Sequence, residues 1–388
     1  ADGVKGGSFH PKGNLPSLLL DTNHTKYISI YHLNKRRDTC NLEHTFNYLN
    51  IPNTTSTSHP QTIYDSPQHL IKFECHRGMC GGLGDVLKGL VSTSLLAALS
   101  NHRFTLEIHK PPLHKYYYYP TSSFVVNETP SDLVILNAFD HKGLTLQPKV
   151  KDGTLYHPDK SFVVRTNANY VQTLVQFDSV YKDKVIEIFG TDNDQIIRGC
   201  MMRFLLEPSP RLLSAAATVL SNLTNEVLIG VQVRTGDRYF KRTSLEQLEG
   251  FLDCYSEHLG DKIDEYYTYV STDLNEVYKV IQDHIPSNNI LTYPEKTSSG
   301  HSERGCGAPG CEPVMERTVV ENFILSVTDS LLPSPSGYSE SAALMGEHYD
   351  AILFQEFCEC VKGRKIEEFM EVIDGRQIPI WTRKKCLF

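Results

Sequence analysis

The sequence predicts an α/β protein built from two domains, each with a parallel sheet. Strand-like and helix-like runs alternate in both halves of the 388 residues, as is typical of sheets covered by helices. The chain is also longer than one compact core usually allows. A Pro-rich stretch near residues 205–215 separates the halves. We therefore expect a stem-like extension over 1–69, an N-terminal α/β domain over 70–210 and a C-terminal α/β domain over 211–388, facing a cleft.

Composition and charge exclude two classes of protein. Apolar residues make up 40% and charged residues 22%, which is ordinary for a globular chain. The formal net charge is −8, whereas a general nucleic-acid binder needs a basic surplus. The longest apolar stretch, Val86–Leu99, is interrupted by polar residues and is too short to cross a bilayer. We expect a soluble chain that binds no nucleic acid.

Cysteines and glycosylation sequons favour the lumen of the secretory pathway. The chain has ten cysteines, and Cys306 and Cys311 share one Gly-rich loop, so we expect both to be oxidised. The alternative is a cytosolic protein with scattered buried thiols. No signal peptide opens the chain, so we expect the Golgi ectodomain of a type II membrane protein whose anchor has been removed. The sequons are at Asn23, Asn53, Asn127 and Asn222.

The N-terminal half contains one clear β-α-β unit. Leu70–Cys75 alternates like a strand, Val86–Leu99 has the apolar pattern of a helix buried on most faces, and Phe104–Ile108 is strand-like again. Tyr27–Tyr31 is the only strand-like run of the extension. Residues 110–175 contain no pattern that predicts chemistry.

The C-terminal half repeats this architecture. Residues 226–233 form a continuous apolar run, as expected of a strand buried on both faces. The elements expected after it are a helix over 244–259, a strand over 266–271, a helix over 274–284, a strand over 289–293, a loop over 294–313, a helix over 316–327, a strand over 330–332 and a helix that includes 342–345.

The first motif that suggests chemistry is the glycine turn, Gly81–Asp85. Gly81, Gly82 and Gly84 would let a ligand approach the backbone, and the helix start that contains Asp85 favours anions or polar sugars. The spacing is not G-x-G-x-x-G, so a dinucleotide site is poorly supported. The structural alternative is that these glycines only make a close helix–strand contact.

The second motif follows the buried strand and contains Gln232, Arg234 and Asp237. Ligands of parallel sheets bind at the carboxyl ends of strands, so Arg234 is placed where a substrate would lie. Its guanidinium suits a diphosphate and would offset the charge of a leaving nucleoside diphosphate. Asp237 would orient Arg234 or act as a base, and Asp273 ends the next strand. The structural alternative is an Arg–Asp pair that closes the sheet.

The third motif is the serine turn, residues 334–339, which leads from a strand into a helix. Hydroxyl groups and helix N-terminal N–H groups together form a neutral phosphate cradle. Routine capping by Ser336 or Ser339 is the alternative. The arginine on the neighbouring strand favours binding. The residues expected to bind are Ser334, Ser336, Gly337, Tyr338 and Ser339.

These motifs resemble the GDP-fucose-dependent fucosyltransferases of the GT-B-like fold, which include α1,2-, α1,6- and protein O-fucosyltransferases. The resemblance covers residues 70–350 and implies two Rossmann-like domains. It implies that Arg234 binds the donor β-phosphate, that Glu321 reads the guanine edge, and that the serine turn lines the phosphates and fucose. The family's usual His-x-Arg is Gln-x-Arg here. The α1,6 branch has a catalytic glutamate where this chain has Arg242, so the base stays open between Asp237 and a carboxylate of the glycine turn.

The resemblance implies an inverting glycosyltransferase that transfers fucose from GDP-fucose to a glycan or glycoprotein hydroxyl, with Arg234 and Asp237 as its catalytic residues. We expect no cofactor and no metal, since no Asp-x-Asp pair ends a strand. The expected partners are a nucleotide-sugar donor and a glycan acceptor, with a membrane contacted only through the removed anchor. Two alternatives stay open: a transferase of this fold that uses another nucleotide sugar, and a non-catalytic lumenal glycan-binding protein on the same scaffold.

Overall fold

The structure is a computed structural model that describes most of the chain after residue 68. The described residues are 69–75, 81–100, 102–108, 112–118, 134–138, 160–176, 179–221, 223, 226–236, 243–294, 311–373 and 375–386. The expected strand at Tyr27–Tyr31, the four sequons, Asp237, Arg242 and Cys306 lie outside these residues.

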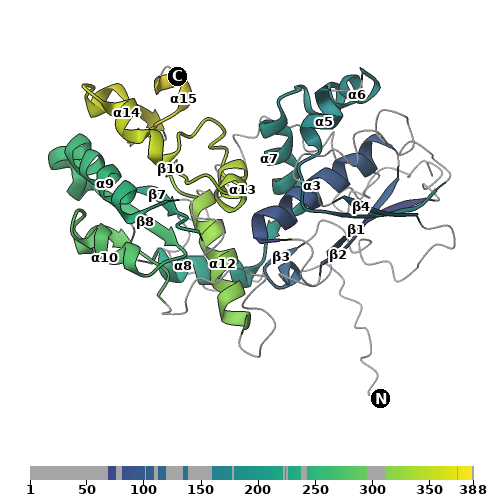
Figure 1. The fold of residues 1–388 in the computed structure, drawn as a ribbon, viewed down its shortest axis with the longest axis horizontal. Coiled ribbons are helices and arrows are strands. Elements are labelled where there is room, and N and C mark those ends of the chain that lie inside the picture. The colour runs from purple at the N-terminus through teal and green to yellow at the C-terminus, as the bar shows by residue number, and fades with distance from the viewer. Residues whose placement is uncertain are drawn as a thin grey trace, which may run out of the picture.

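The first unit is a four-stranded parallel sheet in the order β2-β1-β5-β4 (Figure 1). Its strands are β1 (Leu70–Cys75), β2 (Arg103–Ile108), β4 (Val134–Ala138) and β5 (Phe162–Thr166). Its helices are α3 (Leu83–Leu99), α5 (Val171–Gln176), α6 (Ser179–Phe189) and α7 (Asp194–Leu205). The β-α-β unit predicted from the sequence is therefore present, and β1 has the predicted bounds.

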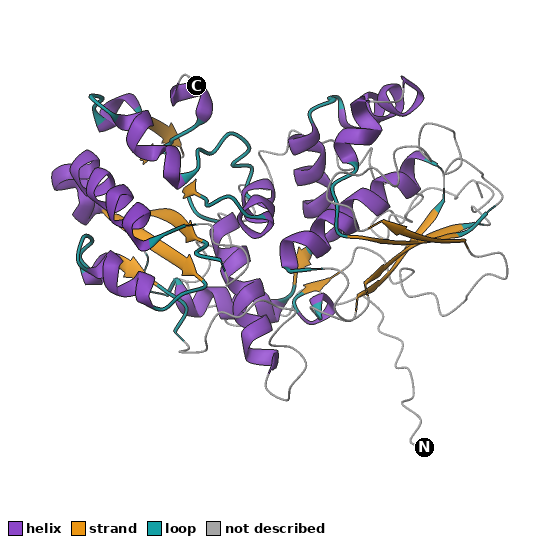
Figure 2. Cartoon of the chain, viewed as in Figure 1, coloured by secondary structure: helices purple, strands orange, loops and turns teal. Residues whose placement is uncertain are grey.

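The second unit is another four-stranded parallel sheet, in the order β10-β7-β8-β9, with helices around it (Figure 2). Its strands are β7 (Val227–Val233), β8 (Tyr266–Thr272), β9 (Ile290–Leu291) and β10 (Ser330–Leu332). Its helices include α8 (Pro210–Val219), α9 (Leu245–Leu259), α10 (Glu276–Gln282), α12 (Cys311–Ser326) and α13 (Gly337–Met345). The predicted pair of α/β units, each built on a parallel sheet, is confirmed.

Several elements differ from their predicted bounds, among them β9 and α12. β9 is only two residues long, and the side chain of Asn289 directly before it donates to the carbonyls of Ile263, Asp264 and Tyr266. α12 begins at Cys311, within the expected loop, and so contains Pro313 in its first turn. A proline is tolerated there because the N–H groups of the first turn have no hydrogen-bond partner within the helix.

A C-terminal segment absent from the predicted elements packs on the second unit. It contains the helix α14 (Phe357–Val361), the antiparallel hairpin of β11 (Met370–Ile373) and β12 (Arg376–Pro379), and the short helix α15 (Arg383–Cys386). Trp381 and Phe357 of this segment are buried against Phe251 and Tyr255 of α9. Burial of these rings holds the segment on one face of the second sheet.

Disulfides fasten the same segment. Cys254 of α9 is bonded to Cys358, and Cys360 is bonded to Cys386 near the end of the chain. Cys75 and Cys200 are disulfide-bonded as well. The predicted oxidation of Cys306 and Cys311 concerns side chains outside the described part. Within the described part, no helix is both long and apolar enough to cross a membrane.

The two units share a continuous hydrophobic core. Side chains of α3 and α7 belong to the same buried cluster as side chains of α12 and α13. A short antiparallel ribbon also crosses between the units, where β3 (Tyr117–Tyr118) pairs with β6 (Glu207–Pro208) directly before α8. The domain limits at 69 and 210 stay predictions.

Candidate functional site

Arg234 lies at the carboxyl end of β7, as predicted, and its guanidinium pairs with Asp273. Arg234 Nη1 is 2.9 Å from Asp273 Oδ2, and the Arg234 side chain is 23% exposed. Asp273 also accepts hydrogen bonds from the Thr235 N–H (2.8 Å), the Thr235 hydroxyl (2.8 Å) and the Gly236 N–H (3.1 Å). The carboxylate of Asp273 therefore keeps three donors if Arg234 turns away.

The serine turn is tied to the end of β7. The Ser334 hydroxyl donates to the side-chain carbonyl of Gln232 and accepts the N–H of Arg234 at 3.1 Å. Ser336 is the N-cap of α13 and accepts the N–H of Ser339 at 3.1 Å, so the capping role exists. The Ser339 hydroxyl donates to the carbonyl of Ser334 and is buried. These hydroxyls fix the shape of the turn, while the first N–H groups of α13 have no carbonyl within the helix.

The glycine turn meets the serine turn. A Cβ placed on Gly84 would lie 2.2 Å from the carbonyl carbon and oxygen of Gly337, so only glycine lets these two helix starts touch. Gly81 has φ +73°, which also favours glycine. Asp85 caps α3 by accepting the Gly82 N–H at 3.3 Å. The glycines thus make a close contact between helices α3 and α13, and bring the two predicted motifs together.

Gly84→Ala should destabilise the protein and disturb the site, because the new methyl group meets backbone atoms that a side-chain rotation cannot move. We expect a loss of about 1 to 3 kcal/mol in the free energy of unfolding, the usual cost of overpacking. Urea denaturation measures it. Gly250→Ala is the matched control, since a Cβ on Gly250 in α9 meets no atom within 4 Å. Gly250→Ala should stabilise by about 0.5 to 1 kcal/mol.

Glu321 of α12 lies against the second sheet, and its side chain is buried, at 2% exposed. Its carboxylate accepts from Arg317 Nε and from the Ser271 hydroxyl, both at 3.1 Å, and Arg317 also donates to the Tyr278 hydroxyl at 2.8 Å. Ser271 is the register partner of Gln232. A buried polar row thus runs beneath the carboxyl ends of β7 and β8. The predicted contact of Glu321 with guanine would require its carboxylate to turn from these partners.

Burial raises the pKa of Glu321 to about 7, although the charge of Arg317 and the two hydrogen bonds act to lower it. The folded protein then binds one proton more than the unfolded chain between the ordinary pKa of 4.5 and about 7. This contribution to stability is full below pH 4.5 and is lost as the pH rises through 7. Urea unfolding of wild type and Glu321→Gln across this range should show a wild-type loss that the variant lacks. Parallel curves would contradict the raised pKa.

Three charged residues beside the glycine turn were not among the sequence predictions. Glu340, in the first turn of α13, lies 3.1 Å from Lys88 Nζ and 2.5 Å from Arg198 Nη1. Burial acts to raise the pKa of Glu340, but the charges of Arg198 and Lys88 outweigh it and keep the pKa below its ordinary value. Lys88 follows Asp85 by three residues on the same helix, and residues at this spacing are neighbours on the helix surface. The spacing could therefore have predicted that Lys88 lies near the glycine turn. Sequence offers no sign of its contact with Glu340.

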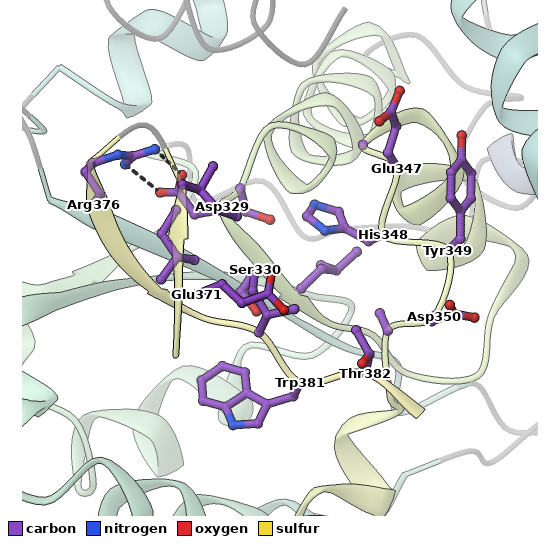
Figure 3. Close-up of a pocket in the computed structure, with 17 residues that line it drawn as sticks. Asp329, Ser330, Glu347, His348, Tyr349, Asp350, Glu371, Arg376, Trp381 and Thr382 are labelled. Atoms are coloured by element: carbon purple, nitrogen blue, oxygen red, sulfur yellow. Dashed lines mark hydrogen bonds and ion pairs between the residues drawn. The ribbon is translucent and has the colours of Figure 1, made fainter. Parts of the chain in front are cut away.

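A separate cavity of about 270 Å³ lies beside the start of β10 (Figure 3), and Arg234 does not line it. The Arg376 guanidinium donates twice to Asp329, at 2.6 and 3.1 Å, on its wall. Glu371, also on the wall, pairs with Lys385 at 2.8 Å. None of the predicted site residues lines this cavity.

Comparison with known proteins gives similarity of structure only. No protein-family model matches the sequence, and no curated protein matches it. A FUT1 mutant of Arabidopsis thaliana solved with GDP is 14% identical, with 84% of this chain and 78% of that chain covered, at a TM-score of 0.49. The fucosyltransferase NodZ from Bradyrhizobium is 11% identical, with 71% and 92% covered, at 0.46.

A third solved structure, POFUT1 in complex with GDP-fucose, is 12% identical, with 74% of this chain and 97% of that chain covered, at a TM-score of 0.43. Similarity of this degree does not decide what this chain binds or catalyses. The chain is similar in structure to solved fucosyltransferases.

Proposed function

We propose that the chain is an inverting glycosyltransferase whose donor is a nucleoside diphosphate sugar, with GDP-fucose implied by the motif resemblance. One observation carries the proposal: the end of β7, the serine turn and the glycine turn meet, since the Arg234 N–H donates to Ser334 and Gly84 contacts Gly337. Ligands of parallel sheets bind at this edge, and helix N-termini attract phosphate. A guanidinium and a helix N-terminus are thus available to one diphosphate.

In the proposed reaction, an acceptor hydroxyl attacks the anomeric carbon from the side opposite the diphosphate. The new oxygen–carbon bond forms as the bond from that carbon to the phosphate oxygen breaks, and the diphosphate leaves with the bonding electrons. Arg234 and the first N–H groups of α13 would stabilise its growing negative charge. These groups help most in the transition state, where that charge develops.

The acceptor proton needs a carboxylate base. Asp237 is the first candidate and lies outside the described residues. Asp85, the carboxylate of the glycine turn, is the second candidate; its Oδ1 is 3.5 Å from the position that a Cβ would take on Gly337. Its other oxygen accepts the Gly82 N–H and holds the side chain in place.

Several finer assignments belong to the same proposal. We propose that Glu321 binds the guanine edge and that transfer needs no metal ion. We also propose that the acceptor is a glycan and that the protein resides in the lumen of the secretory pathway. The disulfides of the C-terminal segment support an oxidising compartment. The alternatives are a transferase of this fold with another nucleotide sugar, and a glycan-binding protein without activity.

A donor panel tests the proposal. The purified protein is incubated with GDP-fucose, GDP-mannose, UDP-galactose and UDP-glucose, with mixed glycan acceptors, and nucleotide release and glycan mass are followed. We expect release from GDP-fucose, unchanged by EDTA, with a deoxyhexose added to an acceptor. Release from another donor alone would favour the first alternative. Glycan binding without any release would favour the second.

A further inference from the structure

We infer that Lys88, from the first unit, is a second cation for the donor diphosphate and turns from Glu340 to the phosphates when the donor binds. This inference rests on the proposed function and deepens it, because it assigns a contact that the sequence motifs do not include. Each of the two units would then contribute one cation to the anion site.

The position of Lys88 is the first support. Its Nζ lies 2.8 Å from where a Cβ on Gly337 would be, so the ammonium lies against the first residue of α13. Ser334, three residues earlier, accepts the N–H of Arg234 at 3.1 Å. The serine turn therefore contacts a cationic residue of each unit: Arg234 through its backbone N–H at Ser334, and Lys88 through its ammonium at Gly337.

Both cations are held in the same way. Arg234 pairs with Asp273, which keeps three other donors, and Lys88 pairs with Glu340, which keeps Arg198 at 2.5 Å. Each cation could therefore move away without leaving its carboxylate unpaired. Breaking a buried ion pair is usually costly because one charge is left without a partner. The side chains of Arg234 and Lys88 are similarly exposed, at 23% and 21%, so both have room to move.

Charge around the turn is the third support. Asp85 lies beside the same start of α13, with Oδ1 3.5 Å from the Cβ position on Gly337. A diphosphate bound there would be repelled by this carboxylate and by Glu340. An ammonium between them offsets that repulsion, and a lysine, with three rotatable donors, suits phosphate oxygens that lie at different angles.

Calorimetric titration of GDP and of guanosine tests the inference on the whole chain. Lys88→Met should bind GDP about tenfold to a hundredfold more weakly, the range expected for a charge-assisted hydrogen bond. Its affinity for guanosine should match wild type. Lys115→Met is the matched control, because Lys115 pairs with Glu312 of α12 at 2.6 Å and so also links the two units. It should bind both ligands like wild type.

The outcomes separate this inference from the proposed function. Failure of wild type to bind GDP would overturn the proposed function and the inference together. Wild-type GDP binding with unchanged binding by Lys88→Met would overturn the inference alone. An equal loss for GDP and guanosine would assign Lys88 a structural role and also overturn it. Lys88→Gln, which keeps a polar side chain, replaces the Met variant if that variant does not fold.

Discussion

Arg234→Ala should lower donor turnover a hundredfold or more, a loss of about 3 kcal/mol in transition-state stabilisation. Arg234 follows the carboxyl end of β7, where its backbone N–H donates to Ser334 of the turn that leads into α13 and its guanidinium pairs with Asp273. In the proposed reaction, the charge of the leaving diphosphate develops at this edge of the sheet. Arg234→Lys should not restore activity, since an ammonium cannot form the two parallel hydrogen bonds of a guanidinium. Initial rates of nucleotide release from the active donor measure both variants.

Thermal melting must accompany these rates. The Arg234 side chain is partly exposed and Asp273 keeps its other donors, so the fold should survive both substitutions. Arg364→Ala is the matched control, since Arg364 pairs with Glu368 at 2.9 Å in the C-terminal segment. Near wild-type turnover by a folded Arg234→Ala protein would contradict the assignment of Arg234 as a ligand of the diphosphate.

Arg317→Met should lower the free energy of unfolding by about 3 to 5 kcal/mol at alkaline pH, where wild-type Glu321 is ionised and the variant must either bury its charge without a partner or bind a proton. Arg317 and Glu321 are both almost fully buried and meet at 3.1 Å, and the methionine would leave Glu321 with only the Ser271 hydroxyl. Urea denaturation at alkaline pH measures the loss. The loss should shrink at acidic pH, where Glu321 is protonated.

The double variant Arg317→Met with Glu321→Met separates charge from packing. Replacing both partners of a buried pair by apolar residues is often neutral, so this protein should recover most of the stability that Arg317→Met loses. If the double variant were as unstable as the single one, the loss would come from packing around α12. The buried polar row would then not depend on the charge of Glu321.

The parts of the fold that sequence predicts well are those with strong local patterns. β1 and β10 have the predicted bounds, and β7 and α9 differ by one residue at their starts. β7 is buried along its whole length, as its continuous apolar run predicts, and α9 buries apolar residues three or four apart, so local pattern and tertiary environment agree. The glycine turn, Arg234 and the serine turn were each placed correctly at ends of strands or starts of helices.

The rest depends on contacts between distant segments. The contact of Gly84 with Gly337 and the pairing of Lys88 with Glu340 join residues far apart in the chain, which no periodicity encodes. Glu321 is predicted through the family resemblance alone, and its pairing with Arg317, one helical turn earlier, is not part of that resemblance. The hairpin of β11 and β12 has short strands with exposed faces, so its pattern is weak.

A crystal structure of the protein with GDP tests the central claim most directly. The account predicts electron density for the diphosphate at the start of α13, within hydrogen-bond distance of the Arg234 guanidinium and the first N–H groups of that helix. It predicts that Asp273 keeps its backbone donors while Arg234 turns from it. Density for GDP in the cavity beside Asp329 and Arg376, or no density at α13 under saturating GDP, would contradict the account.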